Sequence, residues 1–229
     1  MSLTAHLREW VGAWPPPGRG LTVVAVRSRD EPGWDGRVRP LLGAVDADGD
    51  GIVAVSPSIH LQVAELLHGA SADVLEDGDL RARVADVVAG EGAVFGAGAL
   101  RWTTSMDAEV EPLGTWLPHT DPRVPEWLHP FGGEALVALA DDTYIGGVGI
   151  KRHGPTGHEL AVVSAEGHRG KGLARRLVAT AARHELTQVP LVTYLHDRGN
   201  DASAAVADAV GIPDRGWLVL GVFGGDQDA

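Results

Sequence analysis

Cysteine is absent from the 229-residue sequence, which excludes disulfide bonds, thiolate metal sites and a cysteine nucleophile. Basic residues are few: 19 lysines and arginines stand against 31 aspartates and glutamates, for a net charge of −12. This balance disfavours nucleic acid and anionic membranes as partners. No apolar run approaches the roughly 20 residues of a transmembrane helix, and the first residues lack the basic-then-apolar order of a secretion signal. We therefore expect a soluble, cytoplasmic protein that binds neither nucleic acid nor membrane.

Metal-binding patterns are incomplete as well. Asp46, Asp48 and Asp50 imitate the opening of a calcium-binding EF-hand loop, but Pro57 stands where a bidentate glutamate is needed. His184 and the glutamate after it lack the second histidine, four residues further on, of a zinc-protease helix. We therefore expect no metal site.

Apolar residues make up 44% of the chain, enough for a folded core in one large domain or two small ones. In the first half, the apolar runs 21–26, 38–45 and 51–56 are typical of strands, and the last two are joined as a hairpin. Apolar residues at helical spacing follow at 58–67 and 79–88. This half is therefore expected to form an α/β lobe.

The second half begins with three strands, 134–140, 143–152 and 159–164, which predict an antiparallel meander. The fold class expected for the whole chain is α/β (α+β), with a mixed, mostly antiparallel sheet flanked by helices and an additional N-terminal α/β lobe. The elements expected after the meander are a helix from about 173, a strand at 190–195, a helix at 200–210 and a strand at 216–223.

A glycine-rich, basic segment separates the third of these strands from its helix. Glycines at 167, 170 and 172 allow a tight turn and leave backbone amides uncovered. Arg169 and Lys171 add positive charge at a helix start, where unpaired N–H groups already attract anions. The segment therefore predicts a site for phosphate or pyrophosphate, although the same pattern also occurs where glycines merely serve a turn and basic side chains are solvated.

Two common nucleotide motifs do not fit this segment. A P-loop needs a hydroxyl residue where Gly172 stands, and a Rossmann fingerprint needs a βαβ unit rather than a meander. The run Arg169-Gly170-Lys171-Gly172-Leu173-Ala174 instead resembles the acetyl-CoA-binding motif of the GNAT N-acetyltransferase superfamily. The resemblance covers about residues 130–225 and includes Asn200-Asp201-Ala202-Ser203 and Val210-Gly211-Ile212 at family-like spacing.

The resemblance implies a GNAT-type sheet and a division into two domains. Residues 93–229 would form the acetyltransferase domain. Residues 1–92 would form an N-terminal lobe that either shapes the acceptor pocket or is a degenerate, GNAT-like second lobe.

The resemblance also implies how acetyl-CoA would be bound. Amides of the glycine-rich turn would hold the pyrophosphate, backbone groups of the preceding strand would pair with the pantetheine arm, and Asn200 would contact that arm. The cofactor-binding residues expected in this way are Ala161, Val162, Val163, His168, Arg169, Gly170, Lys171, Gly172, Leu173, Ala174, Asn200 and Ser203.

Acetyl transfer to an amine needs a base for the acceptor and is aided by a proton donor for the leaving thiolate. Glu159, a lone carboxylate beside an apolar strand, is the candidate general base. Members of the family often carry a tyrosine as general acid where this sequence has Ala207, so Tyr194 and His196 become the candidate donors. The thiolate can also leave unassisted. Structural roles stay open for Glu159 as a solvated strand-end acid, for Tyr194 in packing and for His196 in a loop.

The function expected from the resemblance is an acetyl-CoA-dependent N-acetyltransferase that moves the acetyl group directly to an amine of a small molecule or peptide. The acidic surface favours a cationic acceptor. The departure at Ala207 leaves an alternative open, a noncatalytic acyl-CoA-binding or regulatory module. A homodimer stays open as an assembly.

Overall fold

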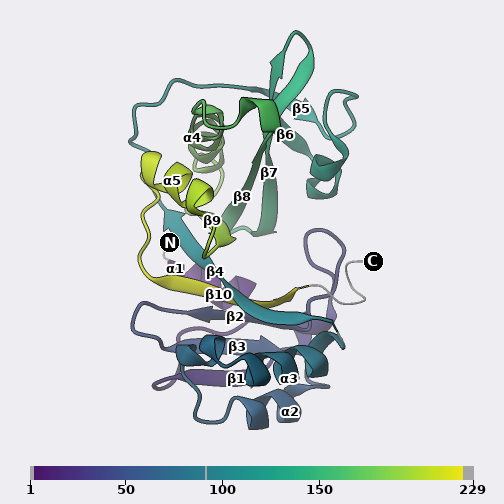
Figure 1. Ribbon diagram of the computed structural model, residues 1–229, viewed down its shortest axis with the longest axis vertical. Coiled ribbons are helices and arrows are strands. Elements are labelled where there is room, and N and C mark those ends of the chain that lie inside the picture. Colours follow the sequence, from purple (N-terminus) through teal and green to yellow (C-terminus); the bar gives the residue numbers. More distant parts are fainter. Residues whose placement is uncertain (1–2, 91, 224–229) are drawn as a thin grey trace. The chain divides into compact units, whose positions relative to one another are not determined.

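Contacts within the chain gather into two units (Figure 1) in the computed structural model, which describes residues 3–90 and 92–223. The first unit comprises Leu3–Leu100 together with the described stretch from Arg215 onward, and the second comprises Arg101–Asp214. The expected domains 1–92 and 93–229 stay a prediction, and their residues 1–2, 91 and 224–229 lie outside the described residues.

The sheet of the first unit contains β1 (Leu21–Ala25), β2 (Leu41–Val45), β3 (Gly51–Val55), β10 (Trp217–Phe223) and the first part of β4 (Val94–Thr103). Their order is β1-β3-β2-β10-β4. β1 is parallel to β3, and all other neighbours are antiparallel. Every residue of β2 and β3 is buried, which explains why both strands read as uninterrupted apolar runs.

Helices α2 (His60–Leu66) and α3 (Gly78–Ala89) pack on this sheet (Figure 1), and their fully buried Val63 and Val84 share a core with Leu220 of β10. The remaining helical elements of the first unit are α1 (Leu3–Trp10) and the 3-10 turns η1 (Arg27–Asp30) and η2 (Ala72–Glu76). Helix α1 ends at Trp10, several residues before Pro15, Pro16 and Pro17.

The sheet of the second unit contains β5 (Thr115–Pro118), β6 (Glu134–Ala140), β7 (Thr143–Gly154), β8 (Gly157–Ser164) and β9 (Val192–Asp197). They lie in the order β9-β8-β7-β6-β5, and only β8 and β9 run parallel. Asp141 and Asp142, with φ of 47° and 61°, form the turn between β6 and β7. Aspartate tolerates this left-handed conformation better than most residues.

Two layers cover this second sheet. On one face, Leu177 of helix α4 (Leu173–Glu185) packs in a core with Ile150 and Leu160. The other face carries the turn η3 (Glu126–Phe131), and Gly149 lets it approach, because a Cβ there would lie 2.6 Å from Cγ of Phe131. The remaining helical elements are η4 (Glu166–His168) and α5 (Asp201–Ala209).

The predicted fold class is confirmed: the chain has a mixed, mostly antiparallel sheet flanked by helices and an N-terminal α/β lobe. The meander, the hairpin of β2 and β3, and helices α4 and α5 lie where the sequence predicts them. Strand β5 was not predicted, because its four residues lie among prolines. Within residues 3–90 and 92–223, no helix combines the length and the apolar character needed to cross a bilayer.

Candidate functional site

The parallel strands β8 and β9 separate after a short paired segment. Their pairing covers only His158–Leu160 of β8, whereas β7 pairs with β8 as far as Ser164. On the β9 side, residues 161–164 therefore have no strand partner in the described part of the chain. Alternate backbone groups of a strand point to each side, and Val163 is 42% exposed. Because the His158 amide donates to Leu191 on the β9 side, it is Val162 among the expected pantetheine-binding residues Ala161, Val162 and Val163 whose backbone groups face this open edge, which an extended ligand can join.

The glycine-rich turn links this strand edge to helix α4. Gly170 and Gly172 have φ of 72° and 75°, values that a residue with a side chain rarely adopts. Gly172 is the N-cap of α4 and supplies no side-chain hydrogen bond to the first turn. A Cβ on either glycine would meet no atom within 4 Å, so the turn opens to the surface. The amides at the start of α4, which no side chain caps, are hydrogen-bond donors suited to an anion.

Basic side chains of the turn are anchored to its own backbone. Lys171 Nζ donates to the carbonyl of Gly167 at 3.0 Å, and Arg169 Nε lies 3.4 Å from the carbonyl of Ser164. Both residues are exposed, His168 and Ala174 are partly buried, and Leu173 points into the core. The positive charges of Lys171 and Arg169 therefore lie near the backbone amides of the turn and add to their attraction for an anion.

Asn200, Ser203 and Tyr194 lie together at the start of α5. The Asn200 side chain caps α5 by accepting a hydrogen bond from the Ser203 amide at 3.0 Å. Burial raises the pKa of Tyr194 above its ordinary value, while Ser203 and the charge of Arg101 act to lower it. Asn200 and Ser203, two predicted cofactor-binding residues, thus meet at the start of α5, and Ser203 also acts on a predicted proton donor.

His196 is held in place by two neighbours. Its Nε2 accepts a hydrogen bond from Nε of Arg101 at 2.9 Å, and Nδ1 lies 2.8 Å from the carbonyl of Asp197. Arginine has only donors and the carbonyl only accepts, so the ring proton is on Nδ1. His196 therefore carries no proton on Nε2 to transfer.

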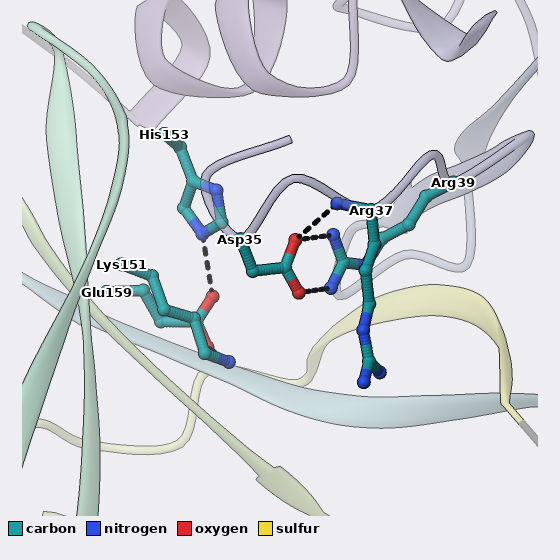
Figure 2. A network of polar contacts seen from close by, with 6 residues as sticks. All are labelled: Asp35, Arg37, Arg39, Lys151, His153 and Glu159. Carbon is teal, nitrogen blue, oxygen red and sulfur yellow. Dashed lines mark hydrogen bonds and ion pairs between the residues drawn. The ribbon is translucent and has the colours of Figure 1, made fainter. Parts of the chain in front are cut away.

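Glu159 lies buried between two cationic or protonatable side chains of the neighbouring strand β7 (Figure 2). Its Oε1 is 2.5 Å from Lys151 Nζ, and its Oε2 is 3.0 Å from His153 Nε2. Burial alone raises the pKa of Glu159, but Lys151 and His153 outweigh it and lower the pKa to about 2. The carboxylate is therefore ionised at neutral pH.

Sequence reasoning did not recognise Lys151 and His153 as partners of Glu159. The alternation of side chains along a strand places residues 151 and 153 on one face, and Lys151 pairs directly with Glu159 across β7 and β8. That alternation is the pattern from which the cluster could have been inferred. Because Leu160 and Tyr194 are paired core residues, Glu159 lies on the sheet face opposite Tyr194.

A second charged cluster belongs to the first unit. Asp35 accepts hydrogen bonds from Nη1 of Arg39 at 2.8 Å and from the Arg37 amide at 3.3 Å (Figure 2). Burial acts to raise the pKa of Asp35, but Arg39 and backbone donors lower it overall. The Arg39 guanidinium also lies 5.9 Å from the ring centre of Trp34. These contacts tie the loop to itself.

Among the described residues, no three His, Asp or Glu side chains are arranged to hold a metal ion. The DADGDG segment forms the predicted hairpin turn, with the Asp46 amide donating to the carbonyl of Asp50 at 2.9 Å.

Comparison with known proteins places residues 101–211, just under half of the chain, in a match to the family "Acetyltransferase (GNAT) family". Among curated proteins, none matches this sequence. Three solved structures are similar at the level of the backbone.

The first is a candidate acetyltransferase of the GNAT family from Novosphingobium aromaticivorans, with 14% identity, a TM-score of 0.49, and coverage of 86% of this chain and 98% of that one. The second is an acetyltransferase of the GNAT family from Colwellia psychrerythraea, with 14% identity, a TM-score of 0.47 and coverage of 79% and 80%. The third is a GCN5-related N-acetyltransferase-like protein from Streptococcus suis, with 13% identity, a TM-score of 0.47 and coverage of 74% and 77%.

Proposed function

We propose a specific reaction for a chain that belongs, through residues 101–211, to the GNAT family of acetyltransferases: direct transfer of an acetyl group from acetyl-CoA to an amine of a small molecule or peptide. The family membership makes the chain an acyltransferase. The observation that carries the finer proposal is the continuous path from the open edge of β8 to the uncapped start of α4.

Acetyl-CoA would be held by backbone groups of two adjoining segments. The open edge at 161–163 suits the amides of the pantetheine arm, which can extend the sheet as an added strand. Within the expected segment 168–174, the amides from Gly170 onward suit the pyrophosphate, because a helix start supplies both donors and a favourable dipole. The amides of His168 and Arg169 instead donate to the carbonyls of Ala165 and Glu166. The residues present therefore fit this cosubstrate, and Asn200 and Ser203 lie at the start of the next helix, α5.

Glu159 is the proposed general base, acting through a water molecule. Its low pKa keeps it ionised, and an ionised carboxylate accepts hydrogen bonds from water and ammonium groups. A pKa of about 2 makes it a weak base, so the ion pair with Lys151 also positions the carboxylate. We expect turnover in Glu159→Gln to fall across the whole pH range rather than to change its midpoint.

Tyr194 is the proposed proton donor to the leaving thiolate. Its hydroxyl carries a hydrogen that can be donated, whereas Nε2 of His196, the other predicted donor, already accepts a hydrogen bond from Arg101. Ala207, which stands where the family often has its acid, is fully buried in the core and offers no polar group. This leaves a noncatalytic acyl-CoA-binding module as the second candidate function.

The acceptor class rests on charge and on chemistry. A direct transfer needs a neutral amine in line with the thioester carbonyl, and the net charge of −12 attracts cationic acceptors over long range. The cytoplasmic location and the homodimer stay predictions.

Thermal stabilisation by acetyl-CoA tests the binding site. We expect saturable stabilisation of the unaltered protein and a loss of affinity of more than tenfold in Gly172→Glu, which puts bulk and negative charge among the amides. Gly69→Glu is the matched control, because Gly69 has a similar φ of 69° and equally open surroundings but lies in the first unit. Equal affinity of both variants would refute the site.

Release of CoA thiol in the presence of a panel of amines then separates the two functions. A transferase releases thiol in proportion to a suitable acceptor, and Tyr194→Phe lowers that rate. Saturable binding of acetyl-CoA without acceptor-dependent thiol from any amine would favour the noncatalytic module.

A further inference from the structure

A buried arginine that the family motif does not mark lies beside the proposed proton donor. Arg101, near the end of β4, is only 4% exposed. Its guanidinium donates to Nε2 of His196 at 2.9 Å, forms an ion pair with Asp208, and lies 3.6 Å from Asp214 and 3.4 Å from the carbonyl of Ile212. A buried charge is unfavourable unless it is well paired, so this set of partners holds the guanidinium in one place.

These partners connect Arg101 to three pieces of backbone around Tyr194. His196 belongs to β9, Asp208 lies in the last turn of α5, and the contacts at residues 212 and 214 hold the segment that follows. Helix α5 is a short, stiff rod of about 13 Å at 1.5 Å per residue. Fixing its C-terminal turn therefore also fixes Ser203 in its first turn, and Ser203 is one of the residues that lower the pKa of Tyr194.

Arg101 also acts on Tyr194 through its charge. Tyr194 and His196 alternate along β9 and so share a face, with their ring centres 6.2 Å apart. Burial raises the pKa of Tyr194, and the Arg101 charge opposes that rise. The phenolate form of Tyr194 is therefore less unfavourable than burial alone would make it.

From this arrangement we propose that Arg101 is a positioning residue for Tyr194, holding β9 and α5 in place beside the phenol through His196 and Asp208, and stabilising the phenolate with its charge. The proposal rests on the proposed role of Tyr194 as proton donor. In the proton transfer, the Tyr194 O–H bond breaks, the proton passes to the leaving thiolate to form the thiol, and the phenolate remains beside Arg101. Water returns the proton afterwards.

The charged and titratable groups of the network that Arg101 forms come from three elements and the segment after α5. They are Arg101 from β4, His196 from β9 and Asp208 from α5, with Asp214 on the following segment. A merely structural clamp would alter the stability of the protein when Arg101 is changed. It would not move the ionisation of Tyr194 in opposite directions when charges of opposite sign are removed.

The sequence makes this ionisation directly measurable, because it contains only two tyrosines, Tyr144 and Tyr194. Carbon-13 labelling of the tyrosine ring gives two NMR signals, and Tyr144→Phe assigns them. Arg101→Met is expected to move the Tyr194 titration midpoint up by about one pH unit, the size expected of a nearby charge in a partly screened site. Arg101→Lys is expected to restore most of that shift.

Asp208→Asn provides a change of opposite sign. Its side chain is 60% exposed, so the variant leaves no buried group without a partner, and it keeps the experiment informative if Arg101→Met does not fold. Removing this negative charge leaves Arg101 less neutralised, and the Tyr194 midpoint is expected to move down. Arg123→Met is the matched control, because Arg123 is a partly exposed, ion-paired arginine of the same unit and is expected to leave the midpoint unchanged.

Turnover separates this proposal from the one it rests on. If Tyr194 donates the proton and Arg101 supports it, Tyr194→Phe and Arg101→Met both lower kcat, by about tenfold for Arg101→Met, with little change in KM for acetyl-CoA. Full turnover in Tyr194→Phe would overturn the role of Tyr194. Reduced turnover in Tyr194→Phe, with an unchanged Tyr194 midpoint in Arg101→Met and Asp208→Asn, would overturn the role of Arg101 alone.

Discussion

Replacing Glu159 by glutamine removes one negative charge from a buried cluster and keeps its shape. The native cluster lowers the pKa of this carboxyl from 4.5 to about 2. A difference of about 2.5 units, at 1.36 kcal/mol each, corresponds to about 3 kcal/mol of stability at neutral pH. Removing one partner of a buried ion pair has an effect of similar size. We therefore expect Glu159→Gln to lose about 3 kcal/mol in the free energy of unfolding at pH 7.

The pH dependence of that loss has a definite sign. A carboxyl whose pKa is lowered by folding contributes stability above pH 4.5, and the contribution disappears as pH falls toward 2. The difference between the unaltered protein and Glu159→Gln should therefore shrink over that interval, as measured by urea unfolding at a series of pH values. Glu134→Gln, on an exposed position of β6, is the control and should show little difference. A Glu159→Gln difference that stays constant from pH 7 to pH 3 would refute the reasoning.

Two further substitutions test the packing and the capping of the second unit by urea unfolding. Gly149→Ala should destabilise the protein by about 1–3 kcal/mol, because its Cβ would overlap the Phe131 ring at 2.6 Å. The control Gly199→Ala, whose Cβ would meet nothing within 4 Å, should not be destabilised. Equal losses of stability in the two variants would contradict the close approach of the Phe131 ring to Gly149. Asn200→Ala should lower the free energy of unfolding by about 1 kcal/mol, because the Ser203 amide loses its cap. Asn200→Asp should keep the stability of the unaltered protein. An equal loss in both variants would exclude capping as the cause.

Local patterns sufficed to predict most strands and helices. The apolar runs at 134–140, 143–152 and 159–164 were enough to predict the meander, because each strand pairs with its neighbour in sequence. The parallel pairing of β1 with β3 was not predictable in this way, because a third strand intervenes in the chain. The prolines around β5 concealed it, since proline runs usually mark loops.

The candidate site was predictable only where a few adjoining residues make it. Gly170 and Gly172 were expected to form a tight turn before a helix, and both have positive φ there. Arg101 was not recognised, because its contact with His196 joins residues 95 positions apart. No spacing rule within one segment can indicate such a contact.

The return of β10 to the first unit has a consequence for synthesis of the chain. β10 lies between β2 and β4 and is paired with both, yet the whole of Arg101–Asp214 is translated before it. While the ribosome works through that insertion, β2 and β4 each have an unpaired edge facing the gap. The first unit is thus translated first but is the last to complete its sheet. A stop codon just before Trp217 would remove β10 and so would damage the first unit more directly than the second.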